Sequence, residues 1–266
     1  MVGVLIVAIP IVLLGAGGCA APTNPSFPVS AADAAAALRD MEANPKRLAR
    51  PVVVLGGYHD PGFGAFVWRE EVQRWAKDPR IIGVSFPFHR DFDQCRRDVI
   101  AAVDRAFPTK DPEATVEVDV IGASMGGLVG RYAAVRKPGE RRLKVVRLIT
   151  VSSPHRGASW ARLPALSKLH ADMRAASAFL QRLEQAEAAT AEDDYELVPY
   201  VRLGDRIVGT HNAARAGATA WWLPNPPLNF AHFAVNRDPR VRADVARRLR
   251  GEPPLTKTPP APVPGA

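Results

Sequence analysis

The sequence predicts an α/β fold, with a mostly parallel sheet of about six strands flanked by helices and carrying a small helical cap. Short apolar runs alternate with segments whose apolar residues recur at helical spacing, which is typical of βαβ units. The apolar runs are continuous, as expected of parallel strands that are buried on both faces. The chain has 266 residues, of which 47% are hydrophobic, and this is enough to bury one sizeable core.

The predicted strands are apolar runs bounded mostly by Gly or Pro. The first, Val52–Leu55, ends in Gly56-Gly57, and the second, Ile81–Phe86, is closed by Pro87. The other four predicted strands are Val116–Ile121, Val145–Val151, Pro199–Leu203 and Ala218–Leu223.

Helical periodicity fills most of the segments between those runs. The predicted helices are Phe66–Lys77, Phe92–Phe107, Gly126–Arg136 and Asp238–Leu249. In the second of them, Val99, Ile100 and Val103 fall on one face, which is the pattern of a helix that packs on a sheet.

Residues 160–192 interrupt the alternation, because they contain no strand signal and their pattern indicates two or three helices. An insertion of this kind between strands is where a cap over a substrate pocket would lie, and Leu, Phe and Met line one face of it. The alternative interpretation is ordinary helical packing.

The two ends differ in composition from the middle of the chain. Residues 1–19 are apolar and then small up to Cys19, the pattern of a signal peptide, and Gly18-Cys19 resembles the lipidation site of bacterial lipoproteins. An uncleaved N-terminal anchor and a wrongly assigned start codon are the alternatives. We expect a linker and helix over residues 20–50, a catalytic domain over 51–250, and a disordered Pro-rich tail over 251–266.

The strongest chemical signal is Gly122-Ala-Ser124-Met-Gly126, between a predicted strand and a predicted helix. A nucleophilic serine on a strand-to-helix turn needs small residues two positions before and after it, because neighbouring backbones approach closely there. The helix start adds a field that favours negative charge. This context predicts that Ser124 is a nucleophile.

Acyl transfer also needs N–H donors for the oxyanion that develops in the transition state. The backbone N–H of Met125, which follows the nucleophile, is one candidate. The turn after the first strand supplies the other, and we assign it to the N–H of Tyr58, because Gly57 lets the backbone approach.

The elbow GASMGGLVGRY and the later segment VSSPHRGAS resemble the α/β-hydrolase lipases and esterases, which carry a similar serine turn and a Thr-Pro-His-x-Gly-like turn. The segment ADMRAASAFLQRL is similar to their cap. The resemblance extends over about 51–250 and implies ester hydrolysis. Many of these lipases have His-Gly where this chain has Gly56-Gly57.

A serine hydroxyl needs a histidine to take its proton and an acid to hold that histidine. In this fold the order is Ser, acid, His. Asp205 follows the fifth predicted strand in a Gly-Asp turn, as the acid does in the related lipases. Both His211 and His232 come after it, and we favour His232 because it precedes the closing helix.

These residues predict a serine hydrolase that cleaves carboxylic esters of lipid or other acyl substrates through an acyl-enzyme. An acyltransferase or amidase with the same triad, and a non-catalytic envelope protein that kept the fold, are the alternatives. We expect export to the cell envelope, as a lipoprotein or a secreted protein, with membrane association through the N-terminus.

No metal or organic cofactor is expected, since no Cys/His spacing indicates zinc and the chain has two cysteines, Cys19 and Cys95. Cys95 lies in a charged helical stretch, where a catalytic role is not expected. The net charge of +8 comes from basic residues mixed with acids, which favours a solvated surface over nucleic-acid binding.

Overall fold

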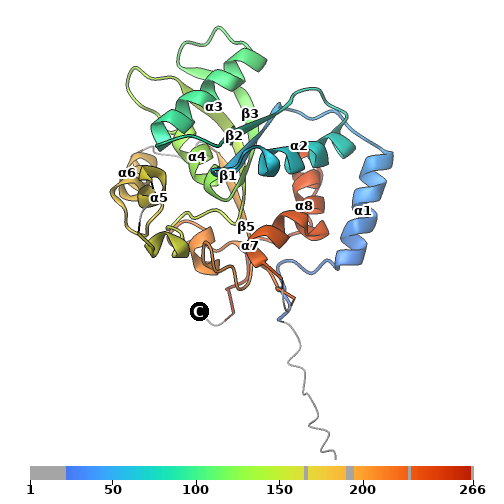
Figure 1. Cartoon of the computed structure of the whole chain (residues 1–266). Coiled ribbons are helices and arrows are strands. Elements are labelled where there is room, and N and C mark those ends of the chain that lie inside the picture. Colours follow the sequence, from blue (N-terminus) through green and yellow to red (C-terminus); the bar gives the residue numbers. More distant parts are fainter. Residues whose placement is uncertain (1–21, 165–166, 190–194, 227–228, 265–266) are drawn as a thin grey trace, which may run out of the picture.

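The computed structural model describes residues 22–164, 167–189, 195–226 and 229–264. Its centre is a six-stranded sheet in the order β2-β1-β3-β4-β5-β6, in which every neighbouring pair is parallel. The strands are β1 Val52–Tyr58, β2 Ile81–Phe86, β3 Ala114–Ala123, β4 Arg142–Val151, β5 Glu196–Arg202 and β6 Trp221–Leu223. The predicted α/β fold class is confirmed (Figure 1).

Helices connect these strands and cover both faces of the sheet. The α-helices are α1 Ala31–Ala43, α2 Phe63–Ala76, α3 Phe92–Ala106, α4 Met125–Ala134, α5 Lys168–Asp172, α6 Ala178–Ala188, α7 Ala231–Ala234 and α8 Pro239–Leu249. Three 3₁₀ turns, η1 Ser159–Arg162, η2 Thr210–Ala213 and η3 Val235–Arg237, lie in the later loops. Local capping sets several of these starts: the Asp91 carboxylate accepts from the Gln94 N–H, at 2.8 Å, where α3 begins.

Two apolar layers hold the helices to the sheet. Alternate residues of β1 point to opposite faces, so that Val52 and Val54 pack with α1, α2 and α8, whereas Val53 and Leu55 pack with α3, α4 and α6. The three-layer arrangement is visible in Figure 1. Both faces of β1 are fully buried, which explains its continuous apolar run.

The strand order places the serine turn at a special point of the sheet. From β1 the chain crosses to β2 on one side, and β3 returns to the other side of β1. Loops that leave neighbouring strands in opposite directions open a crevice at the carboxyl ends of the strands, where ligands bind in open α/β sheets. Ser124 directly follows β3 at this point.

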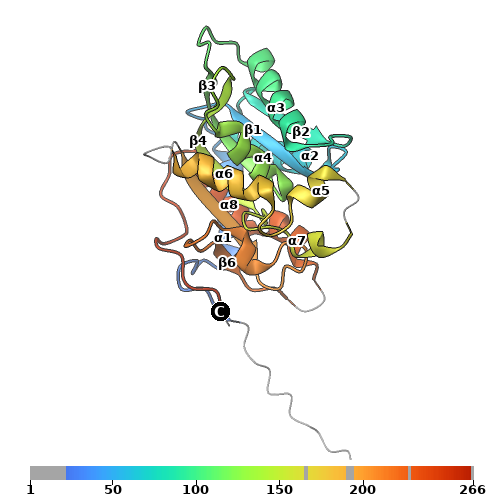
Figure 2. The same cartoon turned by 90° about the vertical axis from the view of Figure 1, so that its left-hand side faces the viewer.

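The described part of residues 160–192 forms helices, as parts of η1, α5 and α6, but α6 lies beside α3 and α4 (Figures 1 and 2). The ring of Phe179 in α6 stacks on Phe92 of α3, with centroids 4.0 Å apart. The apolar face that suggested a cap is thus buried against the flanking helices. In the part of this segment that the structure describes, only Trp160 lines the cavity at the serine.

The described residues 22–30 and 251–264 pack on the folded body, which corrects the expected linker and tail. Residues 22–30 pack beside β6, where the Asn24 side chain donates to the Trp222 carbonyl at 2.7 Å. In the C-terminal segment, the Lys257 N–H donates to the Ser26 carbonyl at 2.8 Å, and the Thr256 N–H to Asp244 at 3.0 Å. Residues 251–264 are therefore not disordered, because their polar backbone groups have partners on the body.

The predictions for residues 1–19, including lipidation of Cys19, lie outside the described residues. No described helix is both long and apolar enough to cross a membrane.

Candidate active site

Ser124 lies on a strained turn between β3 and α4. Its backbone has φ 51° and ψ −124°, a conformation that side-chain-bearing residues rarely adopt, and its N–H donates to the Val151 carbonyl at 2.9 Å. The turn holds the side chain at the start of α4, where it makes no capping bond to the helix. Its hydroxyl is therefore free to point into the adjacent cavity.

The glycines around Ser124 are required by close backbone contacts. A Cβ atom on Gly126 would lie 2.3 Å from the Leu55 carbonyl oxygen, and one on Gly122 would lie 2.5 Å from the Gly127 nitrogen. The first strand and the helix after the serine thus approach each other without side chains between them. This agrees with the physical reason for the small residues in the motif.

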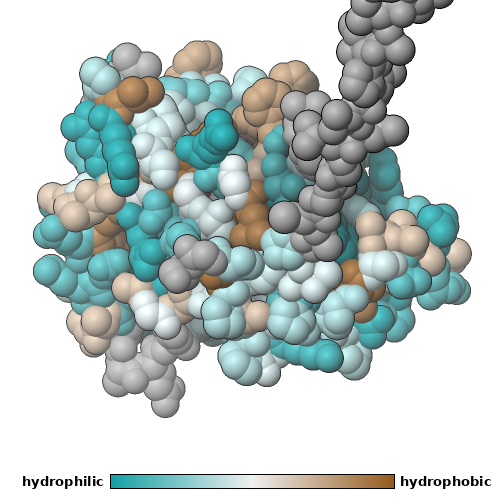
Figure 3. All heavy atoms as spheres, turned by 90° about the horizontal axis from the view of Figure 1, so that it is seen from below, coloured by the Kyte–Doolittle hydropathy of each residue, from teal (hydrophilic) through white to brown (hydrophobic). Residues whose placement is uncertain are grey.

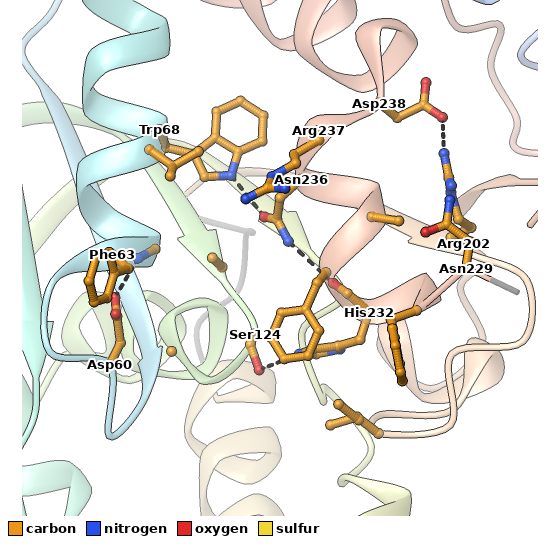
Figure 4. A pocket seen from close by; sticks show the side chains of 18 of the residues that line it. Asp60, Phe63, Trp68, Ser124, Arg202, Asn229, His232, Asn236, Arg237 and Asp238 are labelled. Carbon is orange, nitrogen blue, oxygen red and sulfur yellow. Dashed lines mark hydrogen bonds and ion pairs between the residues drawn. The ribbon is translucent and has the colours of Figure 1, made fainter.

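A continuous chain of hydrogen bonds joins Ser124 to a buried carboxylate. Figure 4 shows its first link, from Ser124 to His232. The Ser124 Oγ lies 3.1 Å from His232 Nε2, and His232 Nδ1 lies 2.9 Å from the Asp205 carboxylate. With the Nδ1 proton directed to the carboxylate, Nε2 is left as the acceptor for the serine proton. The structure thus brings together the three side chains that the sequence selected.

Asp205 is held in place by its own loop. Its Oδ1 accepts from the N–H groups of Ile207 and Val208, both at 3.0 Å, while Oδ2 faces the imidazole. Burial alone would raise the pKa of this carboxyl, but the hydrogen bonds from His232 and the Val208 N–H lower it below its usual value. Asp205 is therefore an ionised partner for the imidazole.

The turn after β1 borders the nucleophile. A Cβ atom on Gly57 would lie 3.5 Å from the Ser124 Cβ, so the loop backbone packs directly against the serine. Tyr58 ends β1 and lines the same cavity, while its hydroxyl lies 2.8 Å from the Ser167 Oγ. Met125 begins α4 next to the serine. Both predicted oxyanion residues are thus neighbours of Ser124.

A cavity of about 1230 Å³ opens beside Ser124 and His232. Its walls are largely apolar and come from α2, η1 and the segments after β5 and β6: Phe63, Val67, Trp68, Trp160, Ile207, Phe230 and Phe233. Apart from Trp160, which lies in the predicted cap, these residues were not selected from the sequence, because local patterns carry no signal that a side chain faces a pocket. Ligand pockets usually measure about 300–1,000 Å³, so this cavity accommodates a lipid-sized molecule.

Asn236 links the histidine segment to α2. Its side-chain carbonyl accepts from the Trp68 indole N–H at 2.9 Å, and its amide donates to the His232 backbone carbonyl at 3.2 Å (Figure 4). His232 lies in α7, a helix of only four residues, which has little stability of its own. Asn236 thus fixes the position of the His232 backbone from outside the triad.

Replacing Asn236 by Ala is expected to lower kcat for a soluble ester by about 3- to 10-fold, the worth of one hydrogen bond. KM should change less than kcat, because the lost contact positions His232 and does not bind substrate. Steady-state kinetics on p-nitrophenyl butyrate measure both constants. A wild-type kcat for Asn236→Ala would contradict the positioning role.

Other residues considered in the sequence lie away from this constellation. His211 is exposed in η2, and Cys95 is buried in α3, where burial raises the pKa of its thiol to about 12. His155, in the Pro-His-Arg-Gly turn, is fully buried and has its Nε2 2.9 Å from the Thr150 hydroxyl. Among the described residues, no cluster of His, Cys, Asp or Glu side chains could hold a metal ion.

Comparisons with known proteins agree with this architecture. Residues 93–202 match the family model described as a PGAP1-like alpha/beta domain, over less than half of the chain. The match includes Ser124 and ends before Asp205. A search of curated proteins finds no match.

Similar solved structures include the lipase BlEst2 from Bacillus licheniformis. The alignment with its mature form, at 15% identity, covers 80% of the present chain and 94% of the lipase chain, with a TM-score of 0.50. The alignment with its propeptide form, also at 15% identity, covers 84% of the present chain and 53% of the lipase chain, with a TM-score of 0.55. At this identity the likeness shows a shared fold.

Proposed function

We propose that this chain, which has the lipase-like α/β-hydrolase fold, is a serine hydrolase that cleaves carboxylic esters of lipid or other acyl substrates. One observation carries the proposal: the hydroxyl, imidazole and carboxylate of Ser124, His232 and Asp205 form an unbroken hydrogen-bonded chain at a large apolar cavity. A nucleophile, a base and an orienting acid in this geometry are the parts that acyl transfer requires.

The proposed reaction has two halves. Ser124 Oγ attacks the acyl carbon while His232 Nε2 takes the hydroxyl proton, and the N–H groups of Tyr58 and Met125 stabilise the oxyanion. When the tetrahedral intermediate collapses, His232 gives that proton to the leaving alcohol and the acyl group stays on Ser124. Water, activated by the same imidazole, then releases the carboxylic acid. Asp205 stabilises the imidazolium in both halves.

The cavity argues for an apolar acyl chain. Because its walls are aromatic and aliphatic, each additional methylene group of a bound acyl chain is removed from water, which is worth about 0.8 kcal/mol when burial is complete. This free energy raises kcat/KM by up to about fourfold per methylene.

The proposal is tested by the hydrolysis of p-nitrophenyl esters from acetate to octanoate by the wild-type protein and Ser124→Ala. We expect kcat/KM to rise with acyl length in the wild type, and the variant to show no turnover. A rate that falls as the acyl chain lengthens would contradict the assignment of the cavity. Labelling of wild type but not of Ser124→Ala by a fluorophosphonate would separate an enzyme from a non-catalytic envelope protein.

The same assays address the other chemistry that the triad allows. Acyl transfer would appear as the ester of an added alcohol in place of the free acid, and amidase activity as release of nitroaniline from an acyl anilide. We further propose that the protein is exported and acts in the cell envelope, with residues 1–19 as its leader and Cys19 as a lipidation site.

A further inference from the structure

Large apolar side chains are exposed on one edge of the molecule only, among the residues that the structure describes. They are Phe63, Phe66, Phe88, Leu163, Phe230 and Phe233. Phe63 and Phe66 lie at the start of α2, which follows β1, and Phe88 follows β2. Leu163 follows η1, which comes after β4, while Phe230 precedes α7 and Phe233 lies in it, after β6. Since the strands are parallel, these segments all meet at the carboxyl edge of the sheet, which carries Ser124.

This aromatic edge extends beyond the substrate cavity. Phe66, Phe88 and Leu163 are not among the residues that line the cavity, yet Phe88 is 87% exposed and Leu163 is 62% exposed. Exposed apolar residues scattered singly over a surface are ordinary, but six on one edge indicate a surface that contacts something apolar. Figure 3 looks onto this edge and shows apolar side chains at several separate points among hydrophilic ones.

The edge is also cationic. Arg90, Arg162 and Arg237 are exposed on the same loops as these apolar residues, and no ion pair joins any of them to another described side chain. Two neighbouring acids offset this charge only in part. Asp60, which accepts from the Gly62 and Gly64 N–H groups, keeps its single negative charge, and Asp238 is buried against two arginines. The unneutralised charge of the edge is therefore positive.

Hydrogen bonds hold the exposed residues in position. The Arg174 guanidinium donates to the carbonyls of Ala161 and Leu163, at 2.9 and 3.0 Å, and so fixes the η1 loop. The loop that precedes Phe88 is held at Pro87, whose carbonyl lies 2.8 Å from the His59 Nδ1. A loop whose backbone is already held loses less conformational entropy when its side chains enter an apolar phase.

We infer that the aromatic edge docks on the surface of an anionic lipid bilayer and presents the cavity to esters held there. Aromatic side chains enter the acyl boundary of such a surface while neighbouring arginines contact anionic headgroups. A second copy of the chain fits less well, because face-to-face pairing would place the same unpaired cations against each other. The inference rests on the proposed function only for its ester-hydrolysis readout.

The test compares three full-length variants that share the same N-terminus, so that any leader or anchor contributes equally. The apolar variant is Phe66→Ser/Phe88→Ser/Leu163→Ser, and the charge variant is Arg90→Glu/Arg162→Glu. The matched control, Arg105→Glu/Lys110→Glu, makes the same charge change at the opposite edge, after β2 and before β3. Each is assayed on soluble p-nitrophenyl butyrate, and on p-nitrophenyl palmitate dispersed in phosphatidylglycerol or phosphatidylcholine vesicles.

We expect all variants to keep wild-type activity on the soluble ester. For half-maximal rate, the apolar variant should need at least about tenfold more lipid than the wild type with both kinds of vesicle. The charge variant should need more lipid with phosphatidylglycerol vesicles only. The control should match the wild type.

An unchanged lipid requirement for the apolar variant would overturn the inference. So would a concentration-dependent dimer in size-exclusion chromatography that this variant abolishes while its vesicle activity stays at the wild-type level. Absence of hydrolysis of either ester by the wild type would instead refute the proposed function. In that case docking is measured by sedimentation of the same proteins with both kinds of vesicle. Equal binding by the wild type and all variants would refute the inferred docking.

Discussion

Replacing Ser124 by Ala is expected to abolish ester hydrolysis, lowering kcat by about 10⁴- to 10⁶-fold. The hydroxyl is the proposed nucleophile, and its distance of 3.1 Å from His232 Nε2 allows proton transfer as the attack proceeds. Turnover of p-nitrophenyl butyrate, with burst kinetics to detect the acyl-enzyme, measures the effect. Wild-type turnover by Ser124→Ala would show that another group is the nucleophile.

A second variant separates chemistry from backbone strain. Ser124→Gly lacks the hydroxyl as well, but glycine tolerates the positive φ of 51° that strains serine and alanine alike. Ser124→Gly should therefore be as inactive as Ser124→Ala and more stable to urea by about 1 kcal/mol. If Ser124→Ala were the more stable variant, the turn would not be storing strain.

Asp205→Asn and His232→Ala are each expected to lower kcat by about 10⁴-fold, with the melting temperature at neutral pH changed much less. The neutral amide that Asp205→Asn introduces cannot stabilise an imidazolium, and His232→Ala removes the base that lies 3.1 Å from the Ser124 hydroxyl. The matched control is His211→Ala, since His211 also follows Asp205 in the sequence but is exposed in η2. Loss of activity in His211→Ala instead would overturn the assignment of the base.

The lowered pKa of Asp205 predicts that the stability of the folded chain depends on pH. Its pKa in the folded chain is lower than its ordinary value, because the hydrogen bonds from His232 and Val208 outweigh the effect of burial. The carboxylate therefore stabilises the folded state above the ordinary pKa of about 4, and this contribution is lost as the pH falls through the folded-state pKa. The difference in melting temperature between wild type and Asp205→Asn should shrink from pH 6 to pH 3.

The local features of this molecule were predictable because short-range interactions decide them. The apolar run Val52–Leu55 is buried on both faces, and β2 has the predicted bounds Ile81–Phe86. The small residues around Ser124 predicted the turn, because their spacing reflects contacts that any side chain would block. The Pro-rich composition of residues 251–264, by contrast, gave no sign of partners that lie on distant segments.

What the sequence by itself determined is the order of strands and helices and the serine turn, both of which follow from interactions between near neighbours along the chain. It favoured His232 over His211 only by the place of His232 before the closing helix, and it gave no sign of most of the cavity walls. Only the tertiary structure decided these points, since it places His232 against a serine 108 residues away and gathers aromatic side chains from separate loops. The physical reason is that parallel strands bring their carboxyl ends to one edge, whatever the length of chain between them.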